Sequence, residues 1–319
     1  MRATEVLHTP DQFCTVSTGM RLCYRTYGPD YAEPLLLIAG LALHLTSWSP
    51  RFIEGLVQRG YHVITFDNRD VGRSSRHLSP PPGVWRQLTR RIAPEAYDLS
   101  DMARDAVGLL DHLQIEQAHL VGMSMGGMIA QTVAARHPER AHSLTSIFST
   151  TGARRVGQPA ASTMWLLSRP PARTRDEAAD RYVKLMRHIG SQGFDRDEER
   201  LRAYAEHAWE RGAGPTAPEG VARQIGAILK SGDRTAELSQ IRVPTLVVHG
   251  DRDRIVHPSG GHATAQAIPE ARHITIHGMG HQISEGVVPY LVDLIDGHAQ
   301  RSPQPAVDTP SRPAQRRSA

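Results

Sequence analysis

The segment Gly122-Met123-Ser124-Met125-Gly126 decides the fold of this chain, because it places a serine between a strand-like run and a helix-like run. The strand-like run His119-LV precedes it, and the helical spacing of Met128 to Ala135 follows it and ends before Pro138. In a G-x-S-x-G turn between strand and helix, small neighbours let the helix pass close to the strand, and the serine hydroxyl projects above the sheet. The flanking runs therefore make Ser124 a candidate nucleophile, although the five-residue pattern alone is weak evidence.

Short apolar runs bounded by turn residues recur on both sides of this segment. They are Pro34-LLLIA-Gly40, His62-VITF-Asp67, Leu144-TSIF-Ser149, Val243-PTLVVH-Gly250 and His273-ITI-His277. Runs without polar alternation suit strands buried on both faces, as in a parallel sheet covered by helices. Helical spacing lies between the runs, as from Leu99 to Leu113 behind a possible Ser100 cap. The alternation predicts a doubly wound α/β sheet.

The N-terminal segment has a different pattern. The runs 13–16 and 22–27, joined through Ser17-Thr18-Gly19, predict an antiparallel hairpin that leads into the parallel set. A two-residue turn at Thr18-Gly19 would place Cys14 opposite Cys23, and a cross-strand disulfide would then be conceivable. We expect two free thiols in a reducing compartment instead.

The strand and helix alternation stops between Thr151 and Ala236. Helix-like patterns near residues 174–189, 195–211 and 219–230 fill this stretch. An insertion of helices between two strands predicts a cap over the C-terminal edge of the sheet, where open α/β sheets bind ligands. The predicted organisation is a core of residues 1–150 and 237–298, a helical cap of 151–236, and a disordered tail of 299–319 rich in Pro, Ser, Gln and Arg.

Composition excludes several classes of function. Of the net charge of +4, +3 lies in the tail from Arg301 onward, so the body has no basic cluster of the kind that nucleic-acid binding requires. The longest apolar run, Pro34 to Leu43, is far shorter than the roughly 18 residues of a membrane span. The N-terminus lacks the apolar segment of a signal peptide, and two cysteines cannot form a four-thiolate zinc site. These features indicate a cytoplasmic protein.

A serine hydroxyl becomes a nucleophile when a histidine takes its proton and a carboxylate orients that histidine. Candidates for both follow Ser124, in the chain order Ser, Asp, His that this architecture requires. Gly250-Asp251-Arg252-Asp253 follows the strand-like run 245–249, and Gly278-Met279-Gly280-His281 follows the run 273–277. Each lies at the C-terminal end of its run, on the edge of the sheet that holds Ser124.

With these motifs on both sides of Ser124, the sequence resembles the α/β hydrolases from about residue 10 to residue 298. The segments that carry the resemblance are the hairpin, the loop after residues 35–39, Asp67-NRDVGRSS-Ser75, VGMSMGG, PTLVVHGDRDRIV and HGMGH. Within the superfamily it is similar to the capped esterase and lipase branch that includes aclacinomycin methylesterase-like enzymes. The resemblance implies an α/β-hydrolase fold: a mostly parallel, doubly wound sheet with an N-terminal antiparallel hairpin and an inserted helical cap.

The resemblance also implies which residues form the catalytic triad. The acid of the family's G-x-x-D pattern is its last position, Asp253, rather than Asp251. Some members carry the acid one strand earlier, but Phe148-Ser149-Thr150 offers no carboxylate there. His281 matches the glycine-flanked position of the base. Packing or hydrogen-bonding roles are expected for the histidines nearby, namely His277, His257 and His262.

Acyl transfer passes through a tetrahedral intermediate whose negative oxygen is met by backbone N–H groups. The resemblance places these donors on Met125 and on Leu41. Ala39-Gly40 stands where many relatives have His-Gly, a change that removes no backbone donor. The segment 67–72 is similar to the family's D-x-R-G-x-G loop, and it predicts a buried network of Arg69 and Asp70 that braces the oxyanion loop.

The sequence thus predicts a serine hydrolase that cleaves carboxylic esters through an acyl-enzyme, most simply a carboxylesterase or lipase-like enzyme. A methylesterase acting on a polyketide, a carbon–carbon bond hydrolase, a peptidase and a perhydrolase stay open on the same triad, as does a non-catalytic ligand-binding module. The mechanism needs no metal and no organic cofactor. A small-molecule ester is the expected partner, without nucleic acid or stable membrane insertion, and the oligomeric state is left open. The apolar cap residues expected to wall the acyl pocket are Trp165, Leu166, Leu167, Leu185 and Met186.

Overall fold

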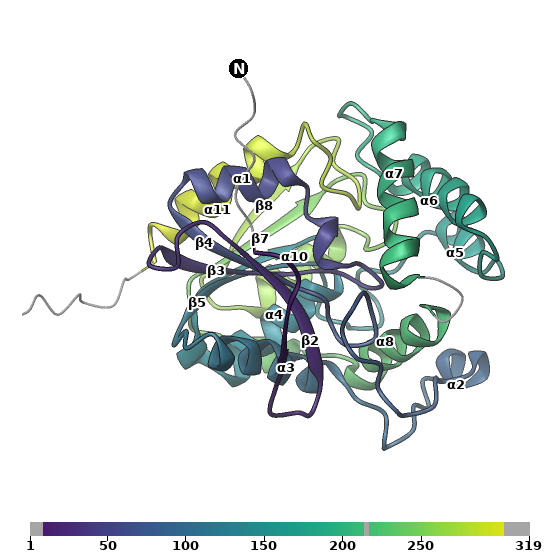
Figure 1. Ribbon diagram of the computed structural model, residues 1–319, viewed down its shortest axis with the longest axis horizontal. Helices are drawn as coiled ribbons and strands as arrows, with labels where there is room; N and C mark the ends of the chain where they lie inside the picture. Colours follow the sequence, from purple (N-terminus) through teal and green to yellow (C-terminus); the bar gives the residue numbers. More distant parts are fainter. Residues whose placement is uncertain (1–8, 214–216, 303–319) are drawn as a thin grey trace, which may run out of the picture.

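An eight-stranded sheet forms the centre of the computed structural model, which describes residues 9–213 and 217–302 (Figure 1). In chain order the strands are β1 (Gln12–Thr15), β2 (Arg21–Tyr27), β3 (Glu33–Ile38), β4 (Tyr61–Phe66), β5 (Ala118–Met123), β6 (Ala141–Ile147), β7 (Thr245–Gly250) and β8 (Arg272–Ile276). Their spatial order is β1-β2-β4-β3-β5-β6-β7-β8. The strands β3 to β8 pair in parallel, whereas β1 and β2 pair antiparallel at one edge. The predicted mostly parallel sheet with an N-terminal hairpin is confirmed.

Helices cover both faces of this sheet, as Figure 1 shows. They are α1 (Pro50–Gln58) and α11 (Val288–Ala299) on one face, and α3 (Leu99–His112), α4 (Met125–Arg136) and α10 (Ser259–Ala267) on the other. Consecutive residues of β3 serve the two sides, since Leu36 and Ile38 pack into one apolar core and Leu35 and Leu37 into the other. A strand between two cores needs apolar side chains at every position, which explains its unbroken apolar run.

The register of the hairpin excludes the conceivable disulfide. Cys14 pairs with Leu22, and Cys23 pairs with Phe13. Because successive side chains of a strand point to opposite faces, this one-residue offset sends the two thiols to different sides of the sheet. Both cysteines are buried and free.

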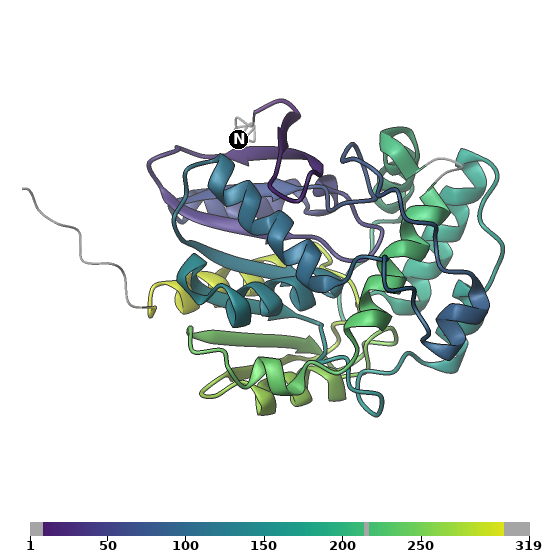
Figure 2. The same ribbon diagram turned by 90° about the horizontal axis from the view of Figure 1, so that it is seen from below.

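Between β6 and β7 the chain forms a series of helices. They are α5 (Ala161–Leu167), α6 (Arg175–Ile189), α7 (Glu198–Ala208), η3 (Trp209–Ala213), α8 (Ala217–Ser231) and α9 (Thr235–Leu238). The segments α6, α7 and α8 match the three predicted patterns, and Figure 2 shows them gathered beside one end of the sheet. Helix α8 also joins the main core, where Ala227 lies with residues of α3 and α4. The boundaries 151–236 of a separate cap stay a prediction.

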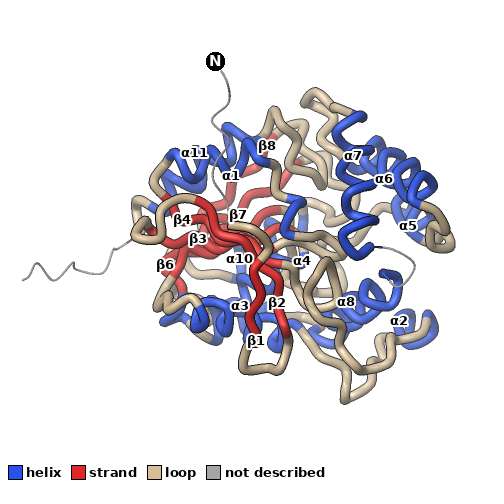
Figure 3. Tube along the Cα trace, in the orientation of Figure 1, coloured by secondary structure: helices blue, strands red, loops and turns tan. Residues whose placement is uncertain are grey.

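The remaining elements are short and lie in connecting segments (Figure 3). They are η1 (Leu45–Ser47), α2 (Val84–Thr89) and η2 (Pro138–Arg140). Helix α11 ends at Ala299, the first residue of the predicted tail, and residues 303–319 lie outside the described part. Within the described ranges, no helix combines the length and apolarity needed to cross a bilayer.

Candidate active site

Ser124 occupies a strained turn between β5 and α4. Its backbone angles are φ 56° and ψ −121°, a conformation that residues with a Cβ rarely adopt. The flanking glycines permit this turn by their lack of a side chain. A Cβ on Gly122 would lie 2.2 Å from the Gly126 carbonyl oxygen, and a Cβ on Gly126 would lie 2.0 Å from the Ile38 carbonyl oxygen. Both glycines of the motif are therefore required by close backbone approach.

The structure brings together the three residues predicted to form a triad. The Nε2 atom of His281 lies 3.0 Å from the hydroxyl oxygen of Ser124. Its Nδ1 atom lies 2.7 Å from Asp253 Oδ2. The three side chains follow the ends of β5, β8 and β7, which meet at one edge of the sheet. The arrangement suits proton transfer from a serine hydroxyl to a carboxylate-oriented imidazole.

The carboxylate of Asp253 is buried and fully engaged. Its Oδ1 atom accepts hydrogen bonds from the backbone N–H groups of Ile255 (2.8 Å) and Val256 (2.9 Å). Burial by itself would raise the pKa of Asp253, but the charge of His281 and hydrogen bonds from His249 and His281 outweigh it. The pKa of Asp253 consequently lies well below its usual range. Asp253 is thus an ionised acceptor aimed at His281.

His249 is a second histidine beside this carboxylate, and sequence reasoning missed it. It is wholly buried at the end of β7, with Nε2 3.4 Å from Asp253 Oδ2 and 2.9 Å from the Val256 carbonyl oxygen. The available signal was its place directly before the G-x-x-D pattern. The contacts of His249 are with the Asp253 carboxylate and the Val256 carbonyl, and not with Ser124.

The loop that carries His281 is attached to the end of α6. The His281 N–H donates to the carbonyl of Ile189 at 2.8 Å. The Ser191 hydroxyl accepts from the Gly280 N–H at 3.1 Å and donates to the Gln282 carbonyl at 2.7 Å. The inserted helices therefore help to position the imidazole, together with its contacts to Asp253 and Ser124.

Asp251 supports the same loop without touching His281. It accepts from the Gly278 N–H at 2.7 Å and lies 3.2 Å from His277 Nδ1. The side chain of His277 is 90% exposed and lies just beyond the end of β8. His257 bonds Ser259, and His262 packs against the ring of His273. None of these histidines is directed at Ser124, as expected.

The predicted oxyanion donors lie beside the serine. A Cβ on Gly40 would be 3.2 Å from the Ser124 Cβ, which places the loop after β3 against the nucleophile. Leu41 is the next residue of that loop. Met125 is the first residue of α4, where backbone N–H groups have no partner within the helix. The assignment of Leu41 and Met125 as donors stays a prediction.

The predicted network of Arg69 and Asp70 is buried, but its side chains do not touch the loop after β3. Arg69 pairs with Asp105 at 2.6 Å, and Asp70 pairs with Arg223 at 2.8 Å. The neighbouring residues brace the loop instead. Asn68 Nδ2 donates to the Ala39 carbonyl at 3.0 Å, and Asp67 Oδ1 accepts from the Leu45 N–H at 2.7 Å. The direct bracing contacts therefore come from Asp67 and Asn68.

The apolar wall expected from the cap residues stays a prediction, and the structure shows how two of these residues lie. Met186 packs with Val183, Ile189 and Leu201 in a small core between α6 and α7. Amphipathic helices that pack on each other bury such residues, so packing between α6 and α7 accounts for the burial of Met186. Trp165 is 62% exposed on α5.

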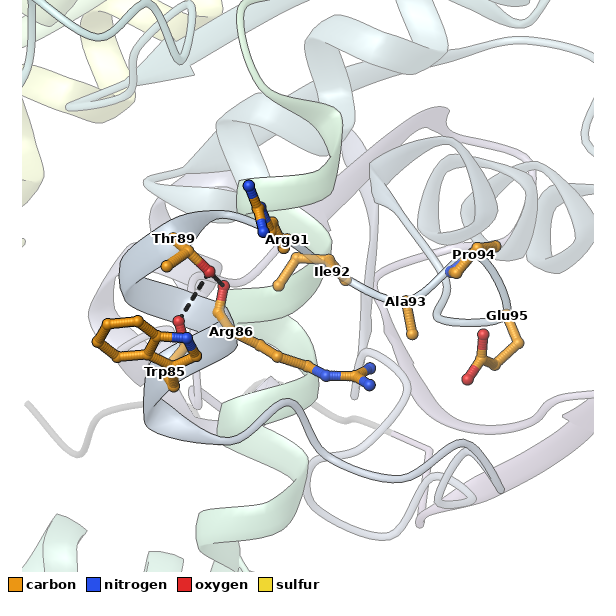
Figure 4. A pocket seen from close by; sticks show the side chains of 8 residues that line it. All are labelled: Trp85, Arg86, Thr89, Arg91, Ile92, Ala93, Pro94 and Glu95. Carbon is orange, nitrogen blue, oxygen red and sulfur yellow. Dashed lines mark hydrogen bonds between the residues drawn. The ribbon is translucent and has the colours of Figure 1, made fainter.

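Two surface hollows lie elsewhere. One, of about 470 Å³, follows the segment from Trp85 to Glu95 (Figure 4). The other, of about 540 Å³, lies near Arg69, Tyr97 and Lys230. Neither is lined by a triad residue. Among residues 9–213 and 217–302, no group of three or more His, Cys, Asp and Glu side chains is placed to hold a metal ion.

The comparison with known families agrees with this geometry. The family described as the alpha/beta hydrolase fold matches residues 33–285, which include all three triad candidates. The chain belongs to the α/β-hydrolase family. It is a hydrolase, as the resemblance implied.

Two relatives of this α/β hydrolase are similar over most of their length. The rhodomycin D methylesterase of Streptomyces peucetius is 33% identical over 298 residues, 86% of this chain and 93% of the relative. The 3-oxoadipate enol-lactonase 2 of Acinetobacter baylyi is 28% identical over 278 residues, 85% and 92% of the two chains. Among solved structures, an enol-lactonase from Burkholderia xenovorans matches with a TM-score of 0.70 at 22% identity, over 91% of this chain and all of that one. At that identity the likeness shows the fold alone.

Proposed function

We propose that this α/β hydrolase is a serine esterase that removes methanol from a carboxylic methyl ester of a small, polyketide-type molecule. The observation that supports serine chemistry is the unbroken hydrogen-bond chain from Ser124 through His281 to the buried Asp253. The methyl ester and the polyketide class come from the similarity to the rhodomycin D methylesterase. This proposal narrows the carboxylesterase or lipase-like prediction to the methylesterase that was an alternative.

The proposed reaction has two halves. Ser124 Oγ attacks the ester carbonyl while His281 Nε2 takes its proton, and Asp253 stabilises the imidazolium. The N–H groups of Leu41 and Met125 bind the negative oxygen of the tetrahedral intermediate. His281 then returns the proton to the departing methoxide oxygen, and methanol leaves. Water deprotonated by His281 attacks the acyl-enzyme, which releases the carboxylate and restores Ser124.

Hydrolysis of an aromatic polyketide methyl ester tests the proposal directly. We expect the free acid and methanol, and in ¹⁸O-labelled water the label should enter the carboxylate, because the acyl–oxygen bond breaks. Ser124→Ala and His281→Ala should each lower kcat by on the order of 10⁴- to 10⁶-fold. A Ser124→Ala variant with undiminished hydrolysis would exclude serine catalysis.

The substrate class needs a separate comparison. The purified protein should be offered the methyl ester, the ethyl and butyl esters of the same acid, p-nitrophenyl esters of graded acyl length and a simple enol-lactone. We expect kcat/KM to be highest for the methyl ester. A strong preference for the lactone or for long-chain acyl esters would refute the methylesterase assignment and leave the serine mechanism intact.

A further inference from the structure

Gln224, on α8, joins two loops of the active site. Its side chain is wholly buried. The Oε1 atom accepts a hydrogen bond from the Ala42 N–H at 3.0 Å, and Nε2 donates to the Arg69 carbonyl at 2.8 Å. A backbone N–H only donates and a carbonyl only accepts, so these partners determine which way the amide group is turned. The side chain is therefore satisfied in a single orientation.

The loop after β3 is attached to its surroundings on both sides of Leu41. On one side, the Ala39 carbonyl accepts from Asn68. On the other, the Ala42 N–H donates to Gln224. Because Leu41 lies between these two attachments, the direction of its own N–H depends on both.

Ala42 itself adopts a conformation that needs support. Its φ is 61°, in the left-handed region that a residue with a Cβ seldom occupies. Such a conformation persists where surrounding contacts hold it. The Gln224 side chain supplies one of these contacts, directly at the Ala42 amide.

Helix α8 is a rigid support for this contact. A Cβ on Gly220 would lie 2.3 Å from the Asp70 carbonyl oxygen, so the helix and the loop after β4 touch backbone to backbone. Arg223 adds an ion pair to the Asp70 carboxylate at 2.8 Å. Gln224 therefore extends toward Ala42 from a helix whose distance to the site is already set.

We propose that Gln224 is a positioning residue that orients the Leu41 N–H toward the oxyanion. It acts by holding the Ala42 amide, which also keeps that N–H from competing for the same oxygen. Gln224 touches no reacting atom. This inference rests on the proposed function, in which Leu41 is an oxyanion donor.

The decisive variant is Gln224→Met, which keeps the length of the side chain and removes both hydrogen bonds. Loss of an oxyanion donor outright costs about 10²- to 10³-fold in kcat. A donor that is present but misdirected should cost less, and we expect kcat to fall about 10- to 100-fold with KM changed by less than about twofold. The Ki of an aryl trifluoromethyl ketone, which adds to Ser124 and forms an oxyanion, should rise by the same factor as kcat falls.

Gln224→Glu separates the Ala42 contact from the Arg69 contact. A glutamate offers an acceptor to the Ala42 N–H whether or not it is protonated, so this variant should keep kcat within a few-fold of the original. Gln131→Met is the matched control. Gln131 is equally buried but bonds Ser146 and Arg234 rather than the loop, so its replacement should lower stability and leave kcat in place.

The outcomes are distinct. Loss of kcat and of inhibitor affinity in Gln224→Met, with both retained in Gln224→Glu and Gln131→Met, supports the inference. Unchanged inhibitor affinity in Gln224→Met overturns it, even if the melting temperature falls. If Gln224→Met does not fold, Gln224→Asn, whose side chain is one methylene shorter, must lose both kcat and inhibitor affinity. Full hydrolysis by Ser124→Ala would instead remove the proposed function, whatever the Gln224 variants do.

Discussion

Replacement of Asp253 by asparagine tests the triad most sharply, because the structure determines how the new amide must turn. The Oδ1 position accepts from two backbone N–H groups, those of Ile255 and Val256. An NH₂ group there would face two donors, so the asparagine oxygen takes that position. The NH₂ group is then directed at His281 Nδ1, which lies 2.7 Å from the Oδ2 position.

This orientation reverses the protonation of the imidazole. Nδ1 must accept from the NH₂ group, so the proton moves to Nε2, the atom that lies 3.0 Å from the Ser124 hydroxyl. A protonated Nε2 cannot take the serine proton. The corresponding substitution in a serine protease lowers kcat by about 10⁴-fold, equivalent to about 5 kcal/mol, and we expect a similar loss here.

Asp251→Asn is the matched control, since it changes the same functional group two residues away. Its oxygen still accepts from the Gly278 N–H, and the substitution weakens only exposed ion pairs with His277 and Arg252. The expected loss of kcat is less than about tenfold. Steady-state hydrolysis of a p-nitrophenyl ester, with circular dichroism to confirm folding, compares the two variants. A larger loss in Asp251→Asn than in Asp253→Asn would refute the assignment of the acid.

Three further predictions concern stability, each measured by chemical denaturation. Gly126→Ala should lower the free energy of unfolding by at least about 3 kcal/mol, because the new Cβ would lie 2.0 Å from the Ile38 carbonyl oxygen. Gly297→Ala should raise it by about 0.5–1 kcal/mol, because no neighbouring atom lies within 4 Å of its Cβ. Equal effects of the two substitutions would contradict this prediction. Burial lowers the pKa of His298 from 6.5 to about 4, so the unfolded chain binds a proton that the folded chain does not. This histidine should contribute a fall in stability of up to about 1.4 kcal/mol per pH unit from pH 6.5 toward pH 4. Burial lowers the pKa of His44 in the same way, so His298→Gln should reduce the slope without abolishing it, and an unchanged slope would exclude a contribution from His298. Met186→Ala should cost about 2–5 kcal/mol and Trp165→Ala less than about 0.5 kcal/mol, and the opposite order would contradict the burial of Met186.

The sheet could be predicted from the sequence because its central strands, such as β3, β4 and β5, lie between two cores and are rich in apolar residues. The short helices α2 and α5 gave no such signal. Trp85 is 76% exposed and Trp165 is 62% exposed, so neither helix shows its largest apolar side chain on a buried face. The predicted N-cap of α3, Ser100, lies two residues after the observed one, Asp98, for a different reason. Ser100 and Asp98 are both good capping residues, but the Asp98 side chain accepts from the Ser100 and Asp101 N–H groups and takes the cap position.

The triad candidates were accessible from the sequence because each follows a recognisable strand, and their chain order narrows the choice. The residues that support them were not. Gln224 contacts Ala42 across 182 positions of the chain, and no local pattern distinguishes it from a glutamine on a solvated helix face. The attachment of His281 to Ile189 is made by backbone atoms, whose partners depend on how α6 ends rather than on residue type.

These contacts divide the proposed active site into two halves with different supports. Ser124 and Asp253 are held by the sheet and its own loops: the Ser124 N–H donates to the Ile147 carbonyl, and Asp253 bonds the two amides that follow it. The base and the oxyanion loop have additional attachments to the insertion, through Ile189 at the end of α6 and Gln224 on α8. A change in the inserted helices can therefore displace the base and one oxyanion donor while the nucleophile and the acid keep their places. Substrate selectivity and catalytic geometry are coupled in such an arrangement, because the segment that would contact substrate also positions half of the catalytic groups.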